Sequence, residues 1–290
     1  MHDTPNLRLV RADNPGPLTG PGTNTFLIGR GRVGVVDPGP DSDAHLAAIL
    51  AALAPGERIA AILVTHAHVD HSELVPRLKA ATGAEVLAFG TATEGRSPTM
   101  QALADPGGGE GLDLDFAPDR RLADGEAVAL GGVRLTAWHS PGHAANHLAF
   151  EADDPAIGML VGDVILGWSS TLISPPDGDL GQYLTTLARL DARGARVLRP
   201  AHGDPVLDPA GRIAALAAHR HERMAAIRAA LADGPATAME LVARIYTDTP
   251  RALWPAAARN VLAHLIALCE SGEAAPQGPF SATARFARIP

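Results

Sequence analysis

The stretch AAILVTHAHVDHSE, residues 60–73, places three histidines and an aspartate within six positions, directly after an apolar run. In an extended chain, side chains two positions apart project to the same side, as His66 and His68 do here. Asp70 and His71 follow where the chain is expected to turn into a helix. Burying four such groups together without a neutralising ion would carry a large desolvation cost. The spacing therefore predicts a metal site, with two histidines available to one ion and the Asp-His step to another.

Strands and helices are expected to alternate over roughly the first two thirds of the chain, which predicts an α/β fold. Short runs rich in Val, Ile, Leu and Phe predict the strands, and runs with Asp or Ser at the start and Gly past the end predict the helices. The expected strands lie at 24–29, 32–39, 58–66, 84–90, twice within 124–143, 147–152, 157–163 and 195–204, and the expected helices at 41–56, 72–83 and 180–194. Residues 93–118 are rich in Gly, Asp and Pro and predict a long surface excursion.

Three further ligand-type residues are expected at the ends of strands. His143, Asp163 and His202 each follow a predicted strand. In layered α/β proteins, ligands and catalytic groups gather at the carboxyl ends of strands. These residues supply a third ligand for either ion and a carboxylate able to bridge the two. Neutral imidazoles and carboxylates suit Zn²⁺ or another first-row divalent metal, so we expect two zinc ions.

The last 80 residues differ in character from the rest. Three helices are expected at 209–234, 237–246 and 250–272, followed by a strand, a loop and a strand within 273–290. Lys and Arg outnumber Asp and Glu here, although the whole chain carries a formal net charge of −8. We therefore predict two domains, a catalytic domain at 1–211 and a smaller helical domain at 212–290.

The cellular setting is inferred from cysteine use and hydropathy. Cys269 is the single cysteine, which excludes an intrachain disulfide framework and removes thiolate from the candidate metal ligands. The N-terminal stretch lacks a basic segment followed by a long apolar one, and no later run is expected to reach the length of a membrane span. A cytoplasmic protein with no membrane partner is the expectation.

Four motifs together resemble the metallo-beta-lactamase superfamily. They are THAHVDH (65–71), SPGHAANH (140–147), VGD (161–163) and AHGD (201–204), in the family's order. The resemblance implies a four-layer αββα sandwich with two metal ions at one edge. It implies that His66, His68 and His143 bind the first ion, that Asp70, His71 and His202 bind the second, and that Asp163 bridges them.

Two further segments are similar to one subgroup of that family. The segments GPGTNTFLIG (20–29) and SPPDGDLGQYLTTL (174–187) resemble beta-lactamase-like proteins that include a mitochondrial single-strand endoribonuclease. The order of the tail helices resembles the winged-helix-like domain of this subgroup. Asp163 stands where some true lactamases use Cys, which is similar to the glyoxalase-II-like and ribonuclease-like hydrolases and argues against antibiotic hydrolysis.

A site of this composition predicts a binuclear metal-dependent hydrolase. Two cations about 3.5 to 4 Å apart lower the pKa of a bridging water and polarise the oxygen of the scissile group, so that a hydroxide held between them attacks. Asp70 is the expected catalytic residue, which orients the hydroxide and takes up its proton. The expected substrate contacts are Asn24, His147, Ser170 and Thr171.

Two substrate classes and one non-catalytic role follow as alternatives. The acidic balance and 4% aromatic content favour a small thioester, ester or lactone as substrate. The subgroup resemblance and the mildly basic tail favour single-stranded RNA, in which case the protein is an endoribonuclease. In the third alternative the protein is a metal-binding regulator that contacts DNA through its winged-helix-like tail. A homodimer is compatible with each of these.

Overall fold

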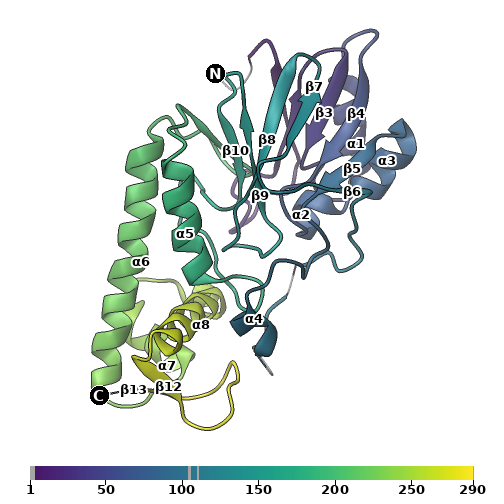
Figure 1. Ribbon diagram of the computed structural model, residues 1–290. Helices are drawn as coiled ribbons and strands as arrows, with labels where there is room; N and C mark the ends of the chain where they lie inside the picture. The colour runs from purple at the N-terminus through teal and green to yellow at the C-terminus, as the bar shows by residue number, and fades with distance from the viewer. Residues whose placement is uncertain (1–3, 104–105, 110, 290) are drawn as a thin grey trace.

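The computed structural model describes residues 4–103, 106–109 and 111–289, and its main strands form two mixed sheets (Figure 1). The first sheet, in spatial order, consists of β1 (Leu7–Arg11), β2 (Asn24–Ile28), β3 (Arg32–Val36), β4 (Arg58–Leu63), β5 (Glu85–Ala88) and β6 (Arg120–Arg121). The second consists of β11 (Leu198–Pro200), β10 (Met159–Gly162), β9 (Leu148–Ala152), β8 (Val133–His139) and β7 (Ala127–Leu130). The pairs from β3 to β6 and the pair β10–β11 are parallel, and the other pairs are antiparallel.

The alternation of side chains along β2 explains how the sheets stack. Phe26 and Ile28 belong to the apolar cluster between the two sheets, whereas Leu27 belongs to the cluster on the outer face. All five residues of β2 are buried, as expected for a strand covered on both faces. The inner cluster also receives Leu135 and Phe150 from the second sheet. The principal core is therefore the layer between the sheets.

Helices cover both outer faces. The first sheet is covered by α1 (Asp43–Ala51) and α3 (Val75–Thr82), and the second by α5 (Leu180–Asp191) and the first half of α6 (Pro209–Ala232). The side chains of Ser42, Asp179 and Asp208 cap α1, α5 and α6 by accepting backbone N–H bonds, which satisfies donors left free at a helix start. The predicted four-layer αββα architecture is confirmed.

The C-terminal part has a core of its own. It contains the second half of α6, α7 (Ala238–Ile245), a 3₁₀ turn (Arg251–Leu253), α8 (Trp254–Glu270), β12 (Ala274–Pro276) and β13 (Phe286–Arg288). The first half of α6 packs against the second sheet through Ile213 and Leu216, and its second half packs in the C-terminal core through Ile227 and Leu231. One helix is thus shared between the two cores, and the boundary at 211/212 stays a prediction.

Three features differ from the sequence expectations. The strands β1 and β6 were not expected, and the excursion 93–118 contains the short helix α4 (Pro98–Ala102). The excursion also returns to the site, because Leu112 forms a β-bridge with His68. These elements depend on pairing with segments that are distant in the sequence, which local pattern does not report.

One helical stretch of the described residues is long and apolar enough to span a membrane. Its range is Arg251–Glu270, with a mean hydropathy of 1.3. The expectation that no run reaches this length and hydropathy is therefore wrong. Val261, Leu262, Leu265 and Ile266 are buried in the C-terminal core, so the hydropathy of α8 is accounted for by packing inside the protein.

Candidate metal centre

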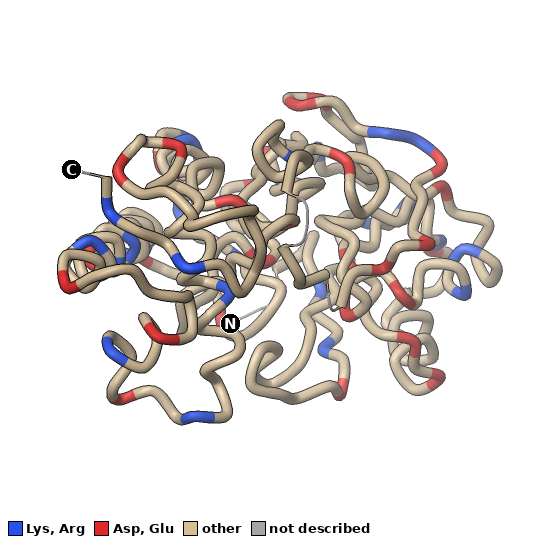
Figure 2. Tube along the Cα trace, turned by 90° about the horizontal axis from the view of Figure 1, so that it is seen from below, with Lys and Arg blue, Asp and Glu red and all other residues tan. Residues whose placement is uncertain are grey.

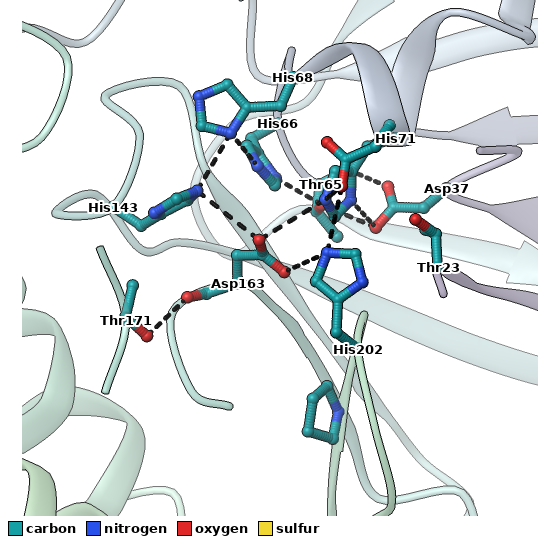
Figure 3. Close-up of polar contacts among 12 residues, drawn as sticks. Thr23, Asp37, Thr65, His66, His68, His71, His143, Asp163, Thr171 and His202 are labelled. Atoms are coloured by element: carbon teal, nitrogen blue, oxygen red, sulfur yellow. Dashed lines mark hydrogen bonds and ion pairs between the residues drawn. The ribbon is translucent and has the colours of Figure 1, made fainter. Parts of the chain in front are cut away.

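All seven predicted ligands converge at one edge of the sandwich (Figure 3). His66 and His68 follow β4, Asp70 and His71 lie in α2 (Val69–Ser72), His143 lies between β8 and β9, Asp163 directly follows β10, and His202 follows β11. Four segments that follow strands of both sheets therefore build the site. Because each strand is fixed by its neighbours in a sheet, the side chains that follow it are held in place by the whole sandwich.

Three imidazoles form the first group of ligands. Nε2 of His66 lies 2.9 Å from Nδ1 of His68, and Nε2 of His143 lies 3.1 Å from the same Nδ1. These three rings are oriented edge to face with their nitrogens turned toward one another. Their ligand atoms all lie within 4.8 Å of one another, which is compatible with binding to one ion.

Asp70, His71 and His202 form the second group. Oδ2 of Asp70 lies 3.2 Å from Nε2 of His202 and 3.6 Å from Nε2 of His71. These ligand atoms also lie within 4.8 Å of one another. Such a set of two imidazoles and a carboxylate suits a first-row divalent metal.

Asp163 lies between the two groups. Its Oδ2 is 3.7 Å from Nε2 of both His143 and His71, and its Oδ1 is 3.4 Å from Nε2 of His202. One carboxylate oxygen therefore faces both groups, which is the position that a bridging ligand requires.

The outer nitrogen of each ligand histidine faces a fixed partner. The partners are Thr65 Oγ1 for His66 at 3.0 Å, Asp177 Oδ2 for His68 at 3.8 Å, Asp37 Oδ2 for His71 at 3.1 Å, the Leu172 carbonyl for His143 at 2.8 Å, and the Gly22 carbonyl for His202 at 3.3 Å. A carbonyl or carboxylate accepts a hydrogen bond from the outer N–H, which fixes the proton on that nitrogen and leaves the lone pair on the inner one. For His71, His143 and His202, the inner nitrogen is thereby prepared to bind a metal.

Two of the atoms that face the space between the ligands have no hydrogen-bond partner. Nε2 of His71 and Oδ1 of Asp163 are buried and accept or donate no hydrogen bond. Lone pairs of neutral imidazoles facing carboxylate oxygens repel each other unless a cation or a proton lies between them. The described residues therefore fit a pair of divalent cations.

The pKa values express the same electrostatic pattern. Burial opposes protonation of His71, but the carboxylates of Asp70, Asp163 and Asp37 raise its pKa well above the usual value. Against the same penalty, Asp163 and Asp70 raise the pKa of His202 to about 9. The carboxylates thus attract positive charge into the space between the ligands, and metal ions would supply that charge.

Asp37 is a functional residue that the sequence analysis missed. It is 2% exposed and has a positive φ of 52°, and it accepts hydrogen bonds from the backbone N–H of Thr65 at 2.7 Å and from Thr65 Oγ1 at 2.8 Å. Together with the bond from His71 Nδ1, Asp37 accepts three hydrogen bonds. Its sequence signal was weak, because an Asp before Pro-Gly is also typical of an ordinary turn.

Three of the four expected substrate contacts have buried side chains that bond within the protein, and their role as substrate contacts stays a prediction. Asn24 donates to the carbonyls of Pro200 and Gly203, at 3.1 and 2.8 Å, and so supports the loop of His202. His147 is fully buried, and its Nε2 accepts the backbone N–H of Asp163 at 3.2 Å.

Thr171 is the third of these residues. It is also fully buried, and its hydroxyl donates to the carbonyls of Asp163 and Val164. Ser170 is partly exposed, and its role as a substrate contact stays a prediction.

The seven side chains differ in their exposure to solvent. The side chains of Asp70 and His68 are 25% and 20% exposed, whereas His66, His71 and His202 are almost completely buried. Asp70 and His68 are therefore the more accessible members of the two groups.

The fold and the site define a family. Residues 18–202 match the metallo-beta-lactamase superfamily, and residues 237–278 match the beta-lactamase associated winged helix domain. The chain belongs to the metallo-beta-lactamase superfamily.

Relatives support this assignment over nearly the whole chain. Beta-lactamase-like protein 2 homolog of Drosophila melanogaster is 30% identical over 90% of this chain and 86% of its own length. Atrochrysone carboxyl ACP thioesterase of Aspergillus chevalieri is 28% identical over 85% of this chain and 75% of its own. The crystal structure of a metallo-beta-lactamase family protein from Thermus thermophilus has a TM-score of 0.78 and 28% identity, and covers 99% of both chains. The similarity thus includes the C-terminal helices.

Proposed function

We propose that the protein is a binuclear metal-dependent hydrolase that cleaves a small thioester, with esters and lactones as related substrates. The observation that carries this proposal is the arrangement of the inner atoms. Nε2 of His71 and Oδ1 of Asp163 are buried and have no hydrogen-bond partner, and each faces ligand-type groups of opposite charge at 3.4 to 3.7 Å, as ligands of cations do. Zinc is the metal that the mixture of imidazole and carboxylate ligands suits.

The described side chains divide into holding and reacting groups. His66, His68 and His143 would hold one ion, and His71 and His202 with Asp70 would hold the other. When bound, a pair of divalent cations supplies a Lewis acid for the scissile carbonyl and lowers the pKa of a coordinated water. Asp163 would keep the two positive charges apart by lying between them.

Asp70 is the proposed proton acceptor. Although burial opposes ionisation, His71 and His202 hold the pKa of Asp70 at about 2, so its carboxylate is charged at neutral pH. Its side chain is more exposed than that of Asp163, at 25% against 12%, so it is the carboxylate that solvent reaches more easily. An attacking water that reaches Asp70 meets an acceptor for its proton.

The charge of the surface favours a small substrate over RNA. The net charge is −8, and Figure 2 shows Lys and Arg interspersed with Asp and Glu when the molecule is seen from below. Binding of RNA depends on clustered cations and on exposed aromatic rings for base stacking. The Aspergillus chevalieri relative, whose name specifies a thioesterase, supports a thioester as the small substrate.

A substrate panel with matched variants tests this proposal. Zinc-loaded protein is assayed on thioesters of increasing acyl length, on esters and lactones, and on single-stranded RNA at two salt concentrations. We expect thioester turnover that hardly changes with salt, and a loss of at least about 100-fold in Asp70→Asn. Asp41→Asn is the control, because Asp41 is an exposed carboxylate paired with Arg77.

Three results would contradict the proposal. RNA cleavage without thioester turnover would favour the endoribonuclease. Binding of duplex DNA without any hydrolysis would favour the regulator. Full activity of Asp70→Asn would remove Asp70 from its assigned role. A cytoplasmic location stays part of the proposal and is tested by fractionation of cells that express the protein.

A further inference from the structure

The segment from Asp163 to Asp177, here called the Asp163 segment, supplies three groups to the metal centre. Asp163 itself faces both groups of ligands. The carbonyl of Leu172 accepts a hydrogen bond from His143 Nδ1 at 2.8 Å, and Asp177 faces Nε2 of His68 at 3.8 Å. The position of this segment therefore determines how His143, His68 and Asp163 are oriented.

Side chains of the C-terminal helices hold the Asp163 segment along its length. From α6, Arg212 donates to the Leu166 carbonyl at 2.8 Å, and Arg220 donates to the Thr171 carbonyl. From α8, Asn260 Oδ1 accepts the Ile173 N–H at 2.9 Å. Arg259, also from α8, donates to Ser174 Oγ at 2.9 Å and to the Pro175 carbonyl. The segment itself is an irregular loop, with no strand or helix among its described residues beyond Asp163. The C-terminal helices thus supply side-chain hydrogen bonds to a segment that contains no strand or helix of its own.

Arg220 is the centre of this contact. It is 1% exposed and is one of the largest fully buried side chains of the described chain. Its guanidinium lies over the ring of Tyr183, 5.3 Å from the centroid, and contacts Asn260 at 3.3 Å. Burial of a guanidinium among neutral partners is costly unless its N–H groups are hydrogen-bonded. Its hydrogen bond to the Thr171 carbonyl comes from an ionised donor, which makes it stronger than a bond between neutral groups.

Thr171 connects Arg220 to the ligand. Its carbonyl accepts from Arg220, and its hydroxyl donates to the Asp163 carbonyl at 2.9 Å and the Val164 carbonyl at 3.0 Å. Leu172, the next residue, carries the carbonyl that orients His143. Two consecutive residues therefore transmit the position of Arg220 to Asp163 and to His143.

The second group of ligands is supported from elsewhere. His71 is held by Asp37 at the end of β3, and His202 by the Gly22 carbonyl and by the loop that Asn24 supports. These supports belong to the first sheet and the N-terminal loop. None of the hydrogen bonds described for Arg220 reaches them.

We propose that the C-terminal helical domain is part of the metal centre, with Arg220 as a positioning residue for the group formed by His66, His68 and His143. The inference rests on the proposed binuclear site. It predicts an asymmetry, because a change at Arg220 disturbs the supports of His143, His68 and Asp163, of which the second ion shares only Asp163, so that the first ion is weakened more than the second. A domain that merely packed against the catalytic domain would affect both ions alike or neither.

Stepwise zinc affinities measure this asymmetry directly. The full-length protein is titrated with zinc in competition with a chelator, and native mass spectrometry counts the ions bound. For Arg220→Met we expect one affinity to fall by about 10- to 100-fold, the range for loss of a group that orients a ligand, and the other, which shares only Asp163 with it, to fall less. Arg220→Lys keeps a cationic donor and should recover part of the loss.

Two further variants separate positioning from folding. Thr171→Val removes the hydroxyl that holds the Asp163 and Val164 carbonyls, and we expect one affinity to fall more than the other in a chain that folds. Arg228→Met is the control on the same helix, because Arg228 is half exposed and pairs with Glu273 away from the Asp163 segment. It should leave both affinities unchanged.

The outcomes distinguish this inference from the proposed function. Unchanged affinities in Thr171→Val and Arg220→Met, or an equal fall of both, would overturn the inference, even if the variants melt at a lower temperature. A wild-type protein that binds fewer than two ions would overturn the proposed function and this inference with it. A protein that binds two ions but cleaves no thioester would refute the function alone.

Discussion

Replacement of Asp37 by asparagine tests how the second ion is held. The carboxylate accepts the proton of His71 Nδ1 at 3.1 Å and two hydrogen bonds from Thr65. Asparagine has the same size and tolerates the left-handed φ of 52°, so the backbone keeps its conformation in Asp37→Asn. The amide, however, has only one oxygen for these three donors.

The structure determines what the amide does to His71. If its oxygen accepts the Thr65 N–H, its NH₂ group faces Nδ1 of His71 and favours the tautomer with the proton on Nε2. That proton occupies the lone pair directed at Asp70 and Asp163. We expect the affinity for one zinc ion to fall by about 10- to 100-fold, or about 1.4 to 2.8 kcal/mol.

Asp37→Ala should behave differently, because it also destabilises the metal-free protein. Three buried donors lose their acceptor, at about 1 kcal/mol or more each, and alanine is strained at a positive φ by about 1 kcal/mol. We expect a loss of at least about 3 kcal/mol in urea unfolding of the metal-free chain. Asp37→Asn should lose less than half of that.

Zinc titration against a chelator is the assay, and Asp41→Asn is the control because its carboxylate is exposed and pairs with Arg77. The reasoning would be refuted if Asp37→Asn bound both ions as tightly as the wild type. It would also be refuted if the loss fell on the same ion that Arg220→Met weakens more, because the two residues support different groups of ligands.

Three further predictions concern stability and metal removal. Gly142→Ala places a Cβ 2.4 Å from the Cα of Tyr183 at a φ of 139°, so we expect the free energy of unfolding in urea to fall by at least about 2 kcal/mol. Gly194→Ala, whose Cβ meets nothing within 4 Å, should lose about 1 kcal/mol. Burial lowers the pKa of His264 to about 4, so the folded chain favours the neutral imidazole. The free energy of unfolding should therefore fall as the pH drops from 6.5 to 4, by about 3 kcal/mol relative to His264→Leu. Parallel curves of unfolding free energy against pH for the two proteins would contradict this. Removal of metal by a chelator should lower the melting temperature, and zinc should restore it; no change in either step would contradict bound metal as a stabilising ligand.

The layers of the fold could be predicted because local pattern and global packing agree in them. The strand around Asn24–Ile28 and the helix around Leu180–Asp191 are short apolar runs with clear start and stop signals. The strand Arg120–Arg121 could not be predicted, since two arginines form a strand only through pairing with Leu87 and Ala88. The sequence expectation included no run that approaches a membrane span, whereas Arg251–Glu270 reaches that length and hydropathy, and hydropathy alone does not separate such a helix from a packed core helix.

The ligands could be predicted because all of them are histidines or aspartates in compact motifs, but their supports could not. Asp37 lies 34 positions from His71, and Arg220 lies 49 positions from Thr171. Arg220 sits in a helical pattern where an arginine is ordinarily exposed. The sequence predicts Asn24 and Thr171 near the site, but only the structure shows that their polar atoms bond to backbone carbonyls of the ligand loops.

The most direct test of the central claim is a crystal structure of zinc-soaked protein with anomalous diffraction recorded at the zinc edge. The account predicts two peaks, one among His66, His68 and His143 and the other among Asp70, His71 and His202, with Asp163 in contact with both. A single peak, or none between these side chains, would contradict the binuclear centre and the chemistry proposed for it.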